Sequence, residues 1–162
     1  MLLNTQILEL FKQLLNLSIE TCGIIKYDGS GEPIIEIHTS QHNTKNRCVH
    51  KYYGLHLFHT HIHKDESFPS AHDIVKVMKN ASIKTSLIIS HWGIWEIISE
   101  RKYLFKPDEQ KHITNTMEKM LSPLHNYKCY NLHVEKYIQD IETKYIDFKL
   151  HINFHSWTHL NK

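Results

Sequence analysis

The stretch that most constrains the fold is residues 55–61, where an apolar run ends in the triplet His59-Thr60-His61. Such a run is typical of a buried strand, and side chains two apart in a strand point to the same face of its sheet. We therefore expect both imidazoles on one face, at the end of a strand. After an intervening loop come Ser70-Ala71-His72-Asp73, and a serine three residues before an acid is the pattern of a helix N-terminus.

A carboxylate at the start of that helix can join the two imidazoles as a third metal ligand. Two histidines, one carboxylate and an open fourth position describe a catalytic Zn²⁺ site, because a structural site has protein ligands at all four positions. The open position accommodates a water, whose pKa Zn²⁺ lowers from about 15.7 to about 7. The sequence therefore indicates a catalytic zinc site formed by these two stretches.

Composition limits the remaining function classes. At 162 residues and 41% hydrophobic content the chain is expected to form one domain with one core. A net charge of +2 is too small to indicate nucleic-acid binding. No run reaches the roughly 18 apolar residues of a membrane span, and the amphipathic first 17 residues lack the basic segment of a signal peptide. We expect a soluble cytoplasmic protein with neither a nucleic-acid nor a membrane partner.

The cysteine content also favours a cytoplasmic location. Cys22, Cys48 and Cys129 are odd in number and form no Cys-x-x-Cys pair. They predict neither a disulfide framework nor a cysteine zinc site, and they favour a reducing environment. Cys22 is expected to be a small buried residue.

The order of the expected elements predicts an α/β fold, with a mixed β-sheet flanked by helices. Helices are expected over residues 1–17, from 70, over 107–121 and over 134–146; strands over 19–27, 34–38, 52–61, 85–90, 94–98 and 147–157. Residues 1–162 are expected to form a single domain, with its core over about 2–122 and a C-terminal extension over about 123–162.

Together with Glu20-Thr21-Cys22-Gly23, the two stretches resemble the signature of the JAMM (JAB1/MPN/Mov34) zinc metalloprotease family, in its prokaryotic JAB-like form. That signature is a glutamate, then His-x-His, then Ser-x-x-Asp. The resemblance covers roughly residues 2–99, and its parts occur in the family's order and in matching structural settings. It implies an MPN-like domain.

The resemblance also implies a role for each matching residue. His59, His61 and Asp73 would bind Zn²⁺. Glu20 would be the general base, which takes a proton from the attacking water and hands it to the leaving amine. Ser70 would donate a hydrogen bond to the oxyanion. A positioned proton transfer is typically worth about 10²–10⁴-fold in rate.

Two departures leave the ligand pair open. The family usually has one residue fewer between the second histidine and the serine, and often a proline where this chain has Ile62. His61-x-His63 is a second His-x-His, so His61 and His63 remain an alternative pair. We prefer His59 and His61, because Phe58 closes an apolar run and Thr60 is a small hydroxyl residue common at that position.

The implied reaction is hydrolysis of a peptide or isopeptide bond after the C-terminal tail of ubiquitin or a ubiquitin-like modifier, as in a deubiquitinase. Such a tail would be bound as an added strand at a sheet edge, with specificity in the loops over 39–51 and 62–69. The alternatives are a phage tail-assembly or other JAB-type peptidase, and a non-catalytic MPN scaffold for protein–protein assembly. Because MPN domains often pair, a homodimer is also an option.

Overall fold

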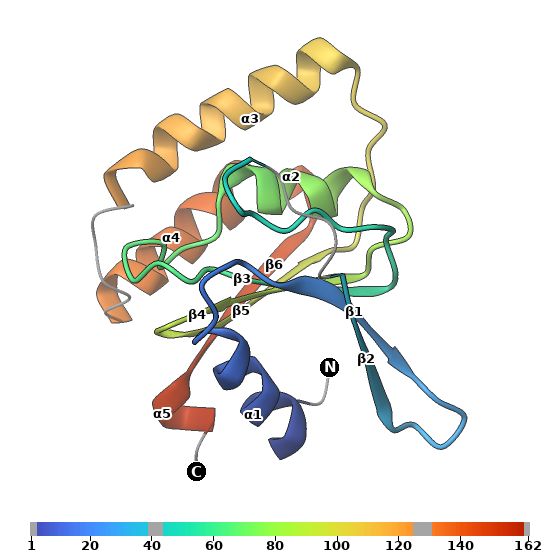
Figure 1. Cartoon of the computed structure of the whole chain (residues 1–162). Coiled ribbons are helices and arrows are strands. Elements are labelled where there is room, and N and C mark those ends of the chain that lie inside the picture. The colour runs from blue at the N-terminus through green and yellow to red at the C-terminus, as the bar shows by residue number, and fades with distance from the viewer. Residues whose placement is uncertain (1–2, 39–43, 125–130, 161–162) are drawn as a thin grey trace.

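A six-stranded mixed sheet, ordered β2-β1-β3-β4-β5-β6, is the centre of the computed structural model, which describes residues 3–38, 44–124 and 131–160 (Figure 1). Its strands are β1 (Cys22–Tyr27), β2 (Pro33–Ile37), β3 (His56–Thr60), β4 (Thr85–Ser90), β5 (Gly93–Ser99) and β6 (Leu150–Ser156). Only β3 and β4 are parallel among the neighbouring strands of this sheet. A parallel pair needs a crossover connection, which α2 (Ala71–Lys79) supplies.

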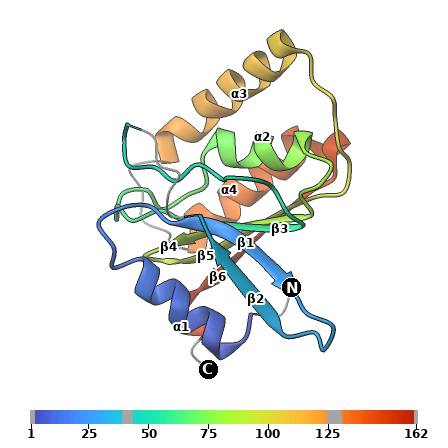
Figure 2. The ribbon, with the colours of Figure 1, turned by 45° about the vertical axis from the view of Figure 1, so that its right-hand side comes forward.

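Helices cover both faces of the sheet (Figures 1 and 2). On one side lie α2, α3 (Pro107–Leu121) and α4 (Asn131–Lys144), and on the other lie α1 (Thr5–Leu14) and the short α5 (Trp157–Leu160). Two short 3-10 segments, Ser122–Leu124 and Ile146–Phe148, complete the helical elements of the described residues.

The alternation of side chains along the strands divides the core into two clusters. Ile24 and Leu57 face the layer of α2, α3 and α4, whereas their neighbours Ile25 and Phe58 face α1. Burial of each such side chain contributes roughly 1.5–3 kcal/mol. The strands beside the predicted site are therefore fixed by packing on both faces.

The predicted α/β class with a mixed sheet and flanking helices is confirmed. The predicted bounds of 107–121 and 85–90 match α3 and β4, while β3 begins at His56 rather than at residue 52. The described part of the region expected to be an extension, residues 131–160, contains α4, whose Tyr137 and Ile141 are fully buried, and β6, which pairs with β5. These residues therefore complete the sheet and its helical layer.

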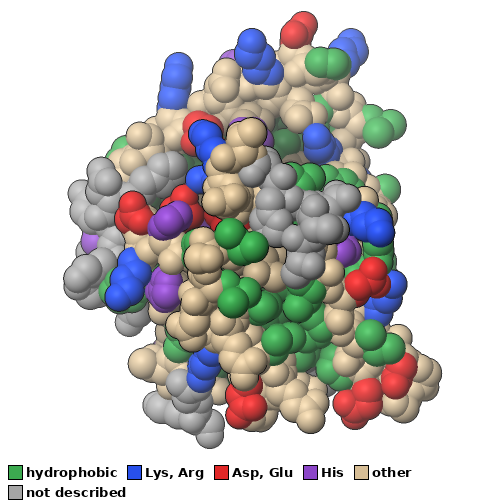
Figure 3. All heavy atoms as spheres, in the orientation of Figure 1, with side chains coloured by type: hydrophobic (Ala, Val, Ile, Leu, Met, Phe, Trp, Pro, Cys, Tyr) green, Lys and Arg blue, Asp and Glu red, His purple; other side chains and the backbone are tan. Residues whose placement is uncertain are grey.

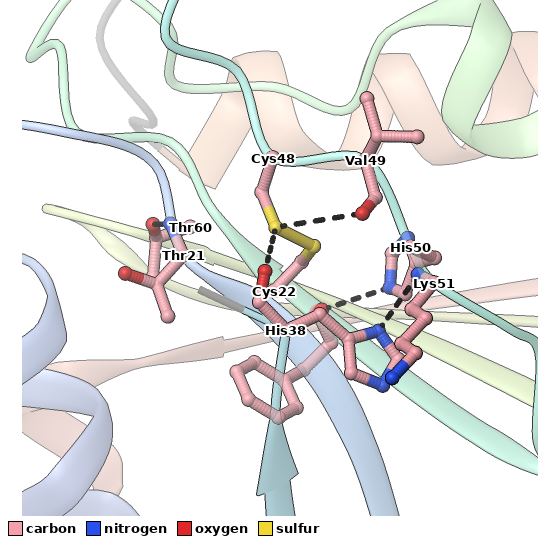
Figure 4. The surroundings of a disulfide bond; sticks show 9 residues. Thr21, Cys22, His38, Cys48, Val49, His50, Lys51 and Thr60 are labelled. Atoms are coloured by element: carbon pink, nitrogen blue, oxygen red, sulfur yellow. Dashed lines mark hydrogen bonds between the residues drawn. A yellow bond between two sulfur atoms is a disulfide. The ribbon is translucent and has the colours of Figure 1, made fainter. Parts of the chain in front are cut away.

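The prediction that the cysteines form no disulfide was wrong. Cys22 and Cys48 are bonded to each other, with their Cα atoms 5.6 Å apart (Figure 4). The pair is 26 residues apart in sequence, and no local spacing indicates that the loop before β3 returns to β1. Cys129 lies outside the described residues. The cysteines therefore no longer support a reducing compartment.

No described helix is both long and apolar enough to span a membrane.

Candidate metal centre

Three side chains converge at the end of β3: His59, His61 and Asp73, all buried. The Nε2 atoms of the two histidines are 3.2 Å apart, and the Asp73 oxygens lie 3.2 Å from Nε2 of His59 and 3.6 Å from Nε2 of His61. Tetrahedral ligands bonded to Zn²⁺ at 2.0–2.1 Å are about 3.3–3.4 Å from one another. The Nε2–Nε2 distance and the distance from Oδ1 of Asp73 to Nε2 of His59 are therefore close to what one tetrahedral ion requires, and the other Asp73 oxygen, Oδ2, is the one 3.6 Å from His61.

The backbone around Thr60 directs the two histidines to the same face. The Thr60 N–H donates to the Thr21 carbonyl at 2.8 Å, and its hydroxyl accepts from the Thr21 N–H at 2.8 Å. The next N–H, that of His61, donates to the Ile89 carbonyl on the other side at 2.8 Å. His59 and His61 are thus fixed between β1 and β4, as alternate residues of an extended segment.

Asp73 is oriented by the N-terminus of α2. The Ser70 N–H and hydroxyl donate to Oδ2 of Asp73 at 2.8 and 2.7 Å, and the Asp73 N–H donates back to Oγ of Ser70 at 3.3 Å. This reciprocal capping box leaves Oδ1 directed at His59. Because the Ser70 hydroxyl hydrogen is engaged with Asp73, the predicted oxyanion contact of Ser70 requires the hydroxyl to rotate, and it stays a prediction.

The protonation states suit a metal ligand set. Burial, together with the electrostatic interaction with His59, lowers the pKa of His61 to about 4. Burial alone would raise the pKa of Asp73, but its charge interaction and hydrogen bond with His59 outweigh this and hold that pKa well below the usual range. At neutral pH the chain therefore presents a neutral imidazole at His61 and an ionised carboxylate at Asp73, the forms that bind metals.

The tautomer of His61 is also set. Its Nδ1 lies 3.3 Å from the carbonyl oxygen of Glu66. A carbonyl only accepts hydrogen bonds, so Nδ1 carries the hydrogen and the lone pair of Nε2 faces His59 and Asp73. Metal-binding histidines characteristically have such an acceptor behind them.

His59, His61 and Asp73 could together hold a metal ion, and we call them the metal-ligating group. Glu20 lies just before β1 and lines the same cavity, but it is not part of this group. It is 7% exposed. Burial raises the pKa of its carboxyl group, and the charges of His59 and Arg47 partly offset that rise. A carboxylate with a raised pKa is suited to proton transfer near neutral pH.

The cavity has a volume of about 440 Å³. Besides His59, His61 and Asp73 it is lined by Glu20, Ser70, Arg47, Cys48, Asp65, Glu66, Ser67, Phe68, His72, Lys76 and Glu118. It therefore brings together all five residues that the sequence singled out.

Two aromatic side chains hydrogen-bond to the backbone of the loop over 62–69. Nε1 of Trp95 donates to the Ser67 carbonyl at 2.8 Å, and the Tyr137 hydroxyl donates to the Pro69 carbonyl at 3.1 Å. The loop is thereby held so that the start of α2 lies beside His59 and His61. His63 lies in it as an exposed residue outside the metal-ligating group, so the structure groups His59, not His63, with His61 and Asp73.

Three residues of this centre were not found from the sequence: Arg47, Cys48 and Glu66. Each lies in a polar loop without periodicity, and none is part of a motif. Of the loop predicted over 39–51, residues 39–43 lie outside the described residues.

No protein-family model, no curated protein and no solved structure matches the chain.

Proposed function

We propose that the protein is a zinc metallopeptidase of the JAMM type, which hydrolyses a peptide or isopeptide bond. The observation that carries this proposal is a group of three converging ligands, His59, His61 and Asp73, in one cavity with a fourth, buried acid that is not part of the group, Glu20. Three protein ligands leave one coordination position open, as in catalytic zinc sites. A separate carboxylate supplies the proton transfer that amide hydrolysis needs.

A bound Zn²⁺ would polarise the substrate carbonyl and lower the pKa of a water. Glu20 takes a proton from the attacking water and delivers it to the leaving amine. Its burial favours this exchange, because a raised pKa brings proton uptake and release closer to neutral pH. Asp73 and His61 are held in their metal-binding forms by Ser70 and by the Glu66 carbonyl.

We propose the extended C-terminal tail of ubiquitin or a ubiquitin-like modifier as the substrate. The JAMM resemblance suggests it, and among the described residues β2 is an edge strand, two strands from β3, to which a further strand could be added. Exposed apolar side chains at this end of the sheet, Tyr27, Ile34 and Ile37, can pack against a partner. Figure 3 shows hydrophobic side chains gathered over the region of α1, β1 and β2.

The test is cleavage of a panel of ubiquitin-like modifiers, each with a reporter joined to its tail, by zinc-loaded protein. The wild type is expected to cleave at least one fusion, and Glu20→Gln to lower the rate about 10²–10⁴-fold because proton transfer is lost. Its zinc content should not change, since Glu20 is not in the metal-ligating group.

The matched control is Glu9→Gln, an exposed glutamate of α1 on the opposite side of the sheet. It should cleave like the wild type. Cleavage by Glu20→Gln at the wild-type rate would remove Glu20 from its role. Zinc-loaded wild type that cleaves no fusion would favour the non-catalytic scaffold.

A further inference from the structure

Residues 46–48 contact Glu20 and the start of β1 at three successive positions. The Glu20 N–H donates to the Asn46 carbonyl at 3.3 Å. Nε of Arg47 lies 4.0 Å from Oε1 of Glu20. Cys48 is bonded to Cys22, two residues after Glu20 (Figure 4).

Arg47 joins two acids that come from different parts of the chain. Its Nη2 donates to Oε1 of Glu66 at 2.8 Å while its Nε faces Glu20. Glu66 is the residue whose carbonyl accepts from His61. The hydrogen bond to Glu66 fixes the position of the guanidinium, and its positive charge, 4.0 Å from Oε1 of Glu20, attracts the Glu20 carboxylate toward the same side.

The disulfide anchors this segment next to the metal centre. Cys22 is paired with His59 in the β1–β3 ladder, so Cys48 is bonded to the strand residue directly beside a metal-ligating residue. Sγ of Cys48 also lies 3.4 Å from the His38 carbonyl (Figure 4). Asn46, just before, has φ of 56°, a left-handed conformation that asparagine tolerates better than most residues. The backbone of Arg47 is therefore set by a turn on one side and a covalent bond on the other.

We propose that Arg47 is a positioning residue, which holds the Glu20 carboxylate toward the three metal-ligating residues, and that the Cys22–Cys48 disulfide keeps Arg47 in place. The expected effect of Arg47 on catalysis rests on the proposed function of Glu20. The attachment of residues 46–48 to the start of β1 does not depend on that function, so the catalytic effect and the attachment can be tested separately.

The disulfide is open to reduction from one side. Cys48 is partly exposed and lines the cavity, whereas Cys22 is fully buried. A thiolate of an added dithiol attacks Sγ of Cys48, the S–S bond breaks, and Cys22 leaves as a thiolate that takes up a proton. The second thiol of the reagent then attacks the mixed disulfide, which frees Cys48 as a thiol and leaves the reagent as an oxidised cyclic disulfide.

The first experiment compares Arg47→Gln and Arg47→Lys with Arg101→Gln, a control at an exposed arginine outside the cavity. Arg47→Gln should lower kcat by about 10- to 100-fold, the cost of a misplaced catalytic group, with KM and zinc content unchanged. Arg47→Lys should recover part of the loss, since it keeps the charge without the fork. A higher KM at unchanged kcat would overturn the proposal, because Arg47 would then bind substrate.

The second experiment does not depend on catalysis. In a Cys129→Ser background, where residues 22 and 48 are the remaining cysteines, hydrogen exchange is compared between the oxidised protein and the protein reduced with dithiothreitol. The Glu20 amide and segment 44–50 should exchange faster after reduction, while zinc content and the amides of β4 stay unchanged. Reoxidation should restore protection, and kcat should fall and recover in parallel.

Unchanged exchange at Glu20 after complete reduction, measured by thiol titration, would overturn the role of the disulfide. Faster exchange in a protein that cleaves no substrate would support the attachment of the segment and contradict the proposed function instead. A Cys22→Ala, Cys48→Ala variant should show the same fast exchange as the reduced protein. If that variant does not fold, the comparison of oxidised with reduced protein still tests the role of the disulfide.

Discussion

At the scale of single residues, the Ser70 hydroxyl group combines two tasks. It caps α2 by accepting from the Asp73 N–H, and it donates to the Asp73 carboxylate that completes the metal-ligating group. Capping by serine is worth roughly 0.5–2 kcal/mol, and a hydrogen bond behind a metal ligand commonly changes metal affinity about 10–100-fold. We therefore expect Ser70 to contribute both to the stability of the protein and to the zinc affinity of the proposed site.

Ser70→Ala should accordingly weaken zinc binding by about 10–100-fold, measured by competition with a chelator of known affinity. Ser70→Thr keeps a hydroxyl at the cap and should stay within a few fold of the wild type. Equal zinc affinity in wild type and Ser70→Ala would show that the capping box does not orient Asp73.

The sequence identified these residues to different degrees. Ser70 and Asp73 were recognisable because capping is a local pattern, and His59 and His61 because they alternate on one strand. Arg47 and Glu66 were not, since their ion pair joins two loops across 19 residues without periodicity in either. The choice between His59 and His63 also needed the register of β3 against β1, which no local pattern contains.

At the scale of elements, the loop over 62–69 depends on an aromatic cluster beneath it. The rings of Phe68, Trp95 and Tyr137 lie in mutual contact, with centroids 5.0 to 5.3 Å apart. Two of the three also bind the loop backbone, through the Ser67 and Pro69 carbonyls. The cluster therefore couples β5 and α4 to the start of α2.

Tyr137→Phe removes one of these hydrogen bonds and leaves the Pro69 carbonyl without its donor. We expect a loss of about 1–3 kcal/mol in the free energy of unfolding, measured by urea denaturation. Tyr53→Phe, at an exposed position in the loop before β3, is the control and should change that free energy by less than about 0.5 kcal/mol. A Tyr137→Phe protein as stable as the wild type would mean that the loop is held without this bond.

The elements themselves were largely predictable. Pro107 followed by acids marks the start of α3, and apolar runs mark β4 and β5. The sequence did not predict which elements contact one another. The pairing of β6 with β5, the packing of α4 against the sheet and the bond between Cys22 and Cys48 all join residues far apart in the chain.

At the scale of the whole molecule, the candidate metal centre lies where β1, β3 and the start of α2 meet. His59 and His61 lie at the end of β3, an inner strand of the sheet with helices on both faces, and Asp73 lies in the first turn of α2. The groups around them, Arg47 and Glu66, come from loops. In many proteins, binding residues on loops are positioned by a rigid scaffold. In such an arrangement the loops can change without disturbing the residues on the strands and helices.

The most direct test of the central claim is zinc stoichiometry by elemental analysis. Wild type is compared with a His59→Ala, His61→Ala double variant and with His63→Ala, a matched change at the neighbouring histidine outside the group. The account predicts about one zinc per chain in wild type and in His63→Ala, as for a single tetrahedral site, and none in the double variant. Folded wild type without zinc, or loss of zinc in His63→Ala, would contradict it.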